Sequence, residues 1–270
     1  MKNFYLKLWR SKFNIPRRAF WKIIRILVSK FNLYEISSDF QNSQMKEIGL
    51  VREDGLTRLD DVLQDVMSKS YDENDGMFSE HLVLISSISL SNSNIKRVLE
   101  VGTHDGRTAL ILSRLFPTAE IITIDLPSDE KSFEETYSRD NSVNEFTNKR
   151  NNLISEVDNI DFREVNSIRL CEWEESFDLI WIDGAHGYPV VAMDVINSYR
   201  LANEGAFILI DDIWKSVELS DAMYKSIGGI ESLNILVNAK LISKYYLFHK
   251  RLGGIFNYPG QKKYVGCFIK

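Results

Sequence analysis

A glycine loop between two apolar runs is the feature that most constrains the fold of this 270-residue chain. The first run, 98–101, is followed by a loop with Gly102 and Gly106 and then by apolar residues at helical spacing. The second run, 121–124, ends in Asp125. A strand, a tight turn, a helix and a second strand predict one parallel βαβ unit, in which glycine lets a ligand approach the backbone. We therefore expect an α/β sheet with a nucleoside-binding half.

The loop also indicates which nucleoside binds. Asp125 would accept hydrogen bonds from both ribose hydroxyls, and the first turn of the helix offers free N–H groups to polar groups. Dinucleotide-binding loops read G-x-G-x-x-G, but Thr103 and His104 stand here where a second glycine would be. A pyrophosphate would therefore bind poorly to this loop. The carboxylate of Glu100 suits a cation, such as the amino and sulfonium groups of S-adenosylmethionine.

Three further carboxylates follow two more apolar runs. Asp183 ends the run 177–182, and Asp211 and Asp212 end the run 206–210. Parallel strands place their C-terminal ends together, so these acids should meet at one edge of the sheet. Oxygen ligands in this number suit Mg²⁺, Mn²⁺ or Ca²⁺. Alternatively, Asp211 and Asp212 serve only to cap a following helix.

The E-x-G-x-x-x-G loop resembles motif I of the class I S-adenosylmethionine-dependent methyltransferases. The sequences I-D-G-A-H-G-Y at Asp183 and I-D-D-I-W at Asp211 resemble the metal-dependent catechol and caffeoyl-CoA O-methyltransferases and their bacterial D-G-x-H relatives (methyltransferase family 24-like). The similarity covers residues from about 75 to 270, and segment 73–81 resembles the family's entrance to the cofactor pocket. It implies a Rossmann-like, doubly wound, seven-stranded sheet of order 3-2-1-4-5-7-6 with an antiparallel last hairpin.

The resemblance also implies roles for individual residues. Asp183, Asp211 and Asp212 match the metal triad, although the family often has Asn at the third position. His186 stands where the plant and animal enzymes carry a catalytic Lys, and with Asp183 it forms the expected catalytic pair. His186 would remove the proton of the acceptor hydroxyl or, alternatively, orient a carboxylate. The expected cofactor-binding residues are Glu100, Gly102, Thr103, Gly106, Asp125, Leu126, Asn166, Ser167 and Asp183.

One contact of this set departs from the family pattern. Asn166 and Ser167 follow the run 160–165, where the family usually has an acid that faces the adenine amino group. The side-chain carbonyl of Asn can still accept a hydrogen bond, so the contact is expected in a weaker form.

The first thirty residues differ in charge from the rest of the chain. They contain nine Lys or Arg and no acid, and subtracting these nine charges from the net charge of −5 leaves −14 for residues 31–270. The acidic remainder should repel nucleic acid. In this basic, aromatic-rich leader the longest run without a charge is far too short to span a bilayer, and Arg25 interrupts the only apolar stretch. It is expected to form amphipathic helices on an anionic membrane or, alternatively, an arm that packs on the acidic domain or a second subunit.

Three domain segments are expected: a basic helical extension at 1–36, a linker at 37–54 and the methyltransferase domain at 55–270. Within the domain, residues 56–69 have helical spacing and should form a cap over the cofactor pocket. The charged insertion 127–152 should form a lid that contributes to the acceptor pocket; a solvated helix is the alternative. The only cysteines, Cys171 and Cys267, indicate no disulfide framework and fit a cytoplasmic protein. The basic leader would place this protein on the inner face of the membrane.

These features predict an enzyme that methylates a hydroxyl on a small molecule, a glycan or a lipid-linked sugar, with S-adenosylmethionine and a divalent cation as cofactors. No nucleic-acid partner is expected, and a homo-oligomer is compatible with the sequence. Three alternatives stay open: a nicotinamide-dependent oxidoreductase, a cephalosporin hydroxylase-like enzyme on the same fold, and an inactive membrane-attached scaffold.

Overall fold

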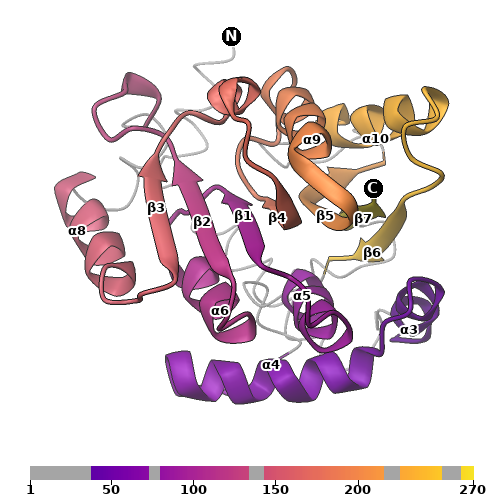
Figure 1. Cartoon of the computed structure of the whole chain (residues 1–270), viewed down its shortest axis with the longest axis horizontal. Coiled ribbons are helices and arrows are strands. Elements are labelled where there is room, and N and C mark those ends of the chain that lie inside the picture. Colours follow the sequence, from indigo (N-terminus) through magenta and orange to yellow (C-terminus); the bar gives the residue numbers. More distant parts are fainter. Residues whose placement is uncertain (1–37, 73–79, 134–142, 216–225, 251–262) are drawn as a thin grey trace, which may run out of the picture.

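The computed structural model describes residues 38–72, 80–133, 143–215, 226–250 and 263–270 (Figure 1). Within them a seven-stranded sheet has the order β3-β2-β1-β4-β5-β7-β6. The first five strands are parallel, whereas β7 runs antiparallel to both β5 and β6. The strands are β1 Arg97–Val101, β2 Glu120–Asp125, β3 Ile160–Glu164, β4 Phe177–Ile182, β5 Ala202–Trp214, β6 Tyr246–His249 and β7 Lys263–Ile269. The Rossmann-like fold class and the strand order predicted from the sequence are therefore confirmed.

Helices cover both faces of this sheet. Two buried apolar clusters lie on the two faces, one beneath α4, α5 and α6 and the other beneath α9 and α10. Because β1, β2, β4 and β5 are buried on both faces, apolar residues occupy most positions on both faces instead of alternating with polar ones. The helices are α3 Ser38–Glu47, α4 Arg52–Met67, α5 Glu80–Ser91, α6 Arg107–Leu115, α8 Val143–Ile154, α9 Val190–Leu201 and α10 Gly228–Asn238, with a 3₁₀ helix at Ser167–Glu172.

The segment expected to be a linker contains a helix. α3 buries Met45 and Gln41, and the Gln41 side-chain amide makes two hydrogen bonds with the backbone of His249. Its Nε2 donates to the His249 carbonyl at 2.8 Å, and its Oε1 accepts from the His249 N–H at 3.1 Å. These bonds satisfy backbone groups at the edge of β6. Gln41 and His249 are 208 residues apart in the chain, so the polar sequence of α3 does not reveal this contact. The expected division into domains stays a prediction, and the extension 1–36 lies outside the described residues.

The expected cap over the cofactor pocket is also placed differently. α4 packs against α5 and α6, and Figure 1 shows it along the bottom of the view, away from the tops of β2 and β3, where these strands end. Its buried Leu59, Val62 and Leu63 belong to the apolar cluster on that face. The predicted helix is present as α4, but its apolar residues pack on the core of the domain and not on a ligand.

Candidate active site

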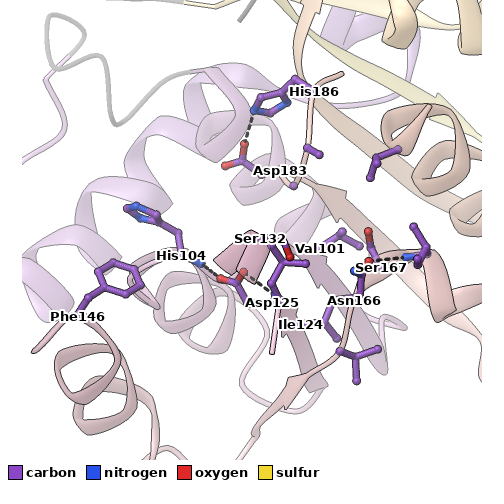
Figure 2. Close-up of a pocket in the computed structure, with 17 residues that line it drawn as sticks. Val101, His104, Ile124, Asp125, Ser132, Phe146, Asn166, Ser167, Asp183 and His186 are labelled. Atoms are coloured by element: carbon purple, nitrogen blue, oxygen red, sulfur yellow. Dashed lines mark hydrogen bonds and ion pairs between the residues drawn. The ribbon is translucent and has the colours of Figure 1, made fainter. Parts of the chain in front are cut away.

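A cavity of about 790 Å³ opens at the C-terminal ends of β1, β2, β3 and β4 (Figure 2). This volume suits a nucleoside-sized ligand together with part of a second molecule. Among the residues that line it are seven of those predicted from the sequence: Gly102, Asp125, Leu126, Asn166, Ser167, Asp183 and His186.

The glycine loop is tight for two reasons. Gly102 and Gly106 have φ angles of +105° and +82°, which side-chain-bearing residues rarely adopt. In addition, a Cβ atom on Gly102 would lie 2.4 Å from the Asp183 carbonyl oxygen, and one on Gly106 would lie 2.8 Å from a methyl carbon of Ile154. These glycines allow the end of β4 and helix α8 to pack directly against the loop, which narrows the cavity floor.

Asp125, at the end of β2, is fixed by backbone groups. Its Oδ2 accepts a hydrogen bond from the backbone N–H of His104, and its Oδ1 accepts one from the N–H of Leu126, both at 2.8 Å. These two bonds fix the carboxylate at the cavity wall. Its expected role in binding the ribose stays a prediction.

Glu100 and Thr103 do not line the cavity. Side chains alternate along β1, so Val101 faces the cavity while Glu100 is buried on the α5 side of the sheet. Thr123 donates to Glu100 at 2.6 Å, and the Thr103 hydroxyl lies 2.6 Å from that of Thr123. Burial raises the pKa of Glu100 to about 8, and Asp125 adds to the rise while the Thr123 hydrogen bond opposes it. The predicted cofactor-binding roles of these two residues stay predictions.

Asn166 caps the 3₁₀ helix that borders the cavity. Its Oδ1 accepts a hydrogen bond from the Ile168 N–H at 3.3 Å, and its Nδ2 donates to Glu130 at 3.2 Å. The side-chain carbonyl expected to face an adenine amino group thus makes a local hydrogen bond, and its contact with adenine stays a prediction. Leu126 and Ile168 also line this end of the cavity and offer apolar surface to a planar base.

An irregularity in β5 places two acids at the same edge. The register of β5 with β7 shifts between Ile210 and Ile213, and Asp212 has a positive φ of 55°. A bulge of this kind re-aims side chains at the end of a strand, and a strained residue here is typical of functional sites. Asp183, His186 and Asp211 each offer one potential ligand atom, and these atoms lie within 4.8 Å of one another.

His186 lies between carboxylates of two strands. Its Nε2 is 3.7 Å from the Asp183 Oδ1 and 3.7 Å from the Asp212 Oδ2. Burial and the neighbouring Asp211 raise the pKa of Asp183. For Asp211, burial opposes ionisation, but the ammonium of Lys250 outweighs it and lowers the pKa. The pKa values of the two acids thus shift in opposite directions, because the Lys250 ammonium is bonded to Asp211.

Two lysines contact the acid cluster, and the sequence analysis identified neither. The Lys250 Nζ donates to Asp211, and it lies 2.6 Å from the Asp212 Oδ1. The Lys263 Nζ is 2.5 Å from the Asp212 Oδ2. No motif marks these lysines, because the hairpin of β6 and β7 brings them to the site. The alternation of the two strands would have been the only signal.

The charged insertion also reaches the cavity. Phe146 of α8 and Ser132 line it, and the Phe146 ring meets that of His104 edge-on at 5.4 Å (Figure 2). His104 is more than half exposed, in keeping with a place at the rim. The lid role stays a prediction, since residues 134–142 lie outside the described part of the chain.

Residues 99–213 match a family model described as a methyltransferase domain. The comparison with curated proteins gives no match. Among solved structures, a putative O-methyltransferase from Klebsiella pneumoniae shares 15% identity over 81% of this chain and 89% of its own, with a TM-score of 0.48. The O-methyltransferase TomG of tomaymycin synthesis from Streptomyces achromogenes, in complex with SAM, shares 14% identity over 87% and 100% of the two chains, with a TM-score of 0.46. The SAH-bound methyltransferase PaMTH1 from Podospora anserina shares 18% identity over 79% of this chain and 88% of its own, with a TM-score of 0.46.

Proposed function

We propose that this chain, whose residues 99–213 match a methyltransferase domain, is a class I S-adenosylmethionine-dependent methyltransferase that methylates a hydroxyl group of a small molecule or glycan. The observation that carries the proposal is the lining of one cavity by both Asp125 and His186. Asp125 suits the ribose of the methyl donor, and His186 suits the removal of a proton from an acceptor. The cavity therefore has a donor end and an acceptor end.

The donor fits the residues present. Asp125 presents a carboxylate at the cavity wall, the group that suits ribose hydroxyls, and Leu126 and Ile168 offer apolar contacts for the adenine. Gly102 lets the end of β4 pack against the loop at this cavity, because a Cβ here would collide with the Asp183 carbonyl oxygen. When bound, S-adenosylmethionine supplies an electrophilic methyl group on a positively charged sulfur.

His186 acts as the general base in this proposal. Its Nε2 takes the proton of the acceptor hydroxyl while the new carbon–oxygen bond forms and the carbon–sulfur bond breaks. The products are a methyl ether, S-adenosylhomocysteine and one proton, which His186 holds. Asp183 and Asp212 each lie 3.7 Å from Nε2, so their charge would favour the imidazole once it holds the proton.

The divalent cation expected from the sequence does not fit the acid cluster as it stands. Asp183, His186 and Asp211 lie close enough together to share an ion. However, Asp211 and Asp212 both bind the Lys250 ammonium, and Asp212 also contacts Lys263. A metal would have to displace a cation already bonded to its ligands. The proposed mechanism therefore has no step that involves a metal, and metal dependence stays a prediction.

The acceptor is proposed from the charge pattern of the leader. A basic, aromatic-rich segment at 1–30 would hold the enzyme at an anionic membrane, where lipid-linked sugars offer hydroxyl groups. These residues lie outside the described part of the chain. Among the described helices, none has the length and apolar character needed to cross a bilayer.

The function can be tested with methyl-tritiated S-adenosylmethionine and extracts of lipids and of water-soluble metabolites. We expect a labelled product whose tritium survives alkali and is released as methyl iodide by hydriodic acid, because methyl ethers behave in this way and methyl esters do not. A His186→Ala variant that still binds S-adenosylmethionine is the control. Label released by alkali would identify carboxyl methylation and contradict the proposal, as would equal labelling by the variant.

A further inference from the structure

Lys250 occupies a central position in the acid cluster. Its ammonium lies against Asp211 and is 2.6 Å from Asp212, and its side chain is only 11% exposed. Lys263, 15% exposed, contacts the other oxygen of Asp212 at 2.5 Å. These ion pairs are shielded from solvent, where charge interactions are stronger than on an open surface.

The charges of the cluster are nearly balanced without a metal. Three carboxylates and two ammonium groups leave at most one negative charge, and a divalent ion would reverse its sign. An ion shared by Asp183, His186 and Asp211 would also lie close to the Lys250 ammonium, which is bonded to Asp211. Repulsion between these cations opposes metal binding as long as Lys250 stays in place.

The hairpin holds the lysines at this position. The backbone N–H of Lys250 donates to the Lys263 carbonyl at 3.0 Å, so the two residues face each other across β6 and β7. Like charges opposite each other on antiparallel strands destabilise a sheet. Here Asp212 lies between the two ammonium groups, because the bulge in β5 and its positive φ turn its carboxylate toward both. The strained backbone and the lysine pair therefore form one arrangement.

We propose that Lys250, supported by Lys263, takes the place of the divalent cation, so that this methyltransferase works without a metal. Lys250 is a positioning residue, since it holds Asp211 and Asp212 in the geometry that His186 uses. The inference deepens the proposed function, because it states how the acceptor end of that same site is neutralised.

The test is a titration of the full-length protein with Mn²⁺, in which electron paramagnetic resonance measures the ion that stays free. The wild-type chain, Lys250→Arg and Lys244→Met should leave Mn²⁺ free. Lys244 is a matched control, because its exposed ammonium pairs with Glu47 far from the cluster. Lys250→Met should gain one bound Mn²⁺ per chain, and the double variant Lys250→Met with Asp211→Asn should lose it.

Two outcomes would overturn the inference: stoichiometric Mn²⁺ binding by the wild-type chain that Asp211→Asn removes, or no gain of Mn²⁺ in a folded Lys250→Met variant. Folding is checked by thermal melting, and if the Met variant does not fold, Lys250→Gln replaces it while the wild-type titration still decides. Calorimetry with S-adenosylmethionine on the same samples separates the two proposals. A wild-type chain that does not bind S-adenosylmethionine would contradict the proposed function. The Mn²⁺ titration, in contrast, tests the role of Lys250.

Discussion

The guanidinium of Arg150 lies 3.9 Å from the carboxylate of Asp125, although Arg150 belongs to the charged insertion and Asp125 to the end of β2. The Arg150 side chain is fully buried, lies 3.4 Å from Glu164 and stacks at 4.2 Å over the Phe162 ring. Helix α8 is thereby tied to the acid that would hold the ribose. Buried ion pairs of this type matter most when one partner is removed, because the other charge is then left uncompensated.

Replacing Arg150 by Met should weaken S-adenosylmethionine binding roughly tenfold, or about 1.4 kcal/mol, because Asp125 loses its charged neighbour and α8 its anchor. Titration calorimetry measures this change. The control is Lys149→Met, since Lys149 is exposed and pairs with Glu145 along the helix surface. Equal affinities of wild type and Arg150→Met would contradict the prediction, as would an equal loss in the control.

His186→Ala and His186→Gln should lower turnover by on the order of 10²- to 10⁴-fold, the usual contribution of a general base. Binding of S-adenosylmethionine should stay unchanged, because Asp125 and the glycine loop hold the donor. The measurement is the initial rate of methyl transfer to the acceptor found by labelling, together with calorimetry. A variant that keeps the wild-type rate would remove His186 from the mechanism.

Glu100→Gln should change how stability depends on pH. The pKa of Glu100 rises from an ordinary value of 4.5 to about 8 in the folded chain, so the folded state holds a proton that the unfolded state has already released. Stability should therefore fall as pH rises from about 4.5 to about 8, and the Gln variant should lack this part of the fall. The free energy of unfolding of the Gln variant, relative to that of the wild type, should be greater at pH 8 than at pH 5 by on the order of 3 kcal/mol.

Urea unfolding at pH 5 and pH 8 measures this difference. The variant Glu156→Gln serves as a matched control, since Glu156 is exposed. A parallel shift of both variants at both pH values would show that Glu100 is not the buried acid responsible.

Deleting residues 1–30 should abolish sedimentation with vesicles that contain phosphatidylserine. The nine positive charges of this segment would otherwise bind the anionic headgroups. Vesicles of phosphatidylcholine alone are the control, and added salt should weaken binding to the anionic vesicles because it screens the charges. Unchanged sedimentation after the deletion would assign the leader to a different role.

The parallel part of the sheet could be predicted from the sequence because each of these strands appears as a short apolar run. The runs at 98–101, 121–124, 177–182 and 206–210 correspond to β1, β2, β4 and β5, and the acid after each of the last three lies at the expected edge. Buried parallel strands need apolar side chains on both faces, and this need leaves a pattern in a short stretch of sequence. The order of the strands came from the resemblance to a family.

The remaining features depend on contacts between distant segments. α3 forms where Gln41 can bond the edge of β6, and Lys250 reaches Asp211 only through the hairpin. The direction of Glu100 depends on strand alternation at the loop, which a motif does not specify. Sequence reasoning therefore found the carboxylates of the site but missed the cations that balance them.

The central claim is that the cavity at Asp125 binds S-adenosylmethionine. The most direct test is titration calorimetry of the wild-type chain and of Asp125→Ala with S-adenosylmethionine and, separately, with NAD. The account predicts binding of one S-adenosylmethionine per wild-type chain, loss of that binding in Asp125→Ala, and no binding of NAD. Binding of NAD in place of S-adenosylmethionine, or S-adenosylmethionine binding that does not depend on Asp125, would contradict it.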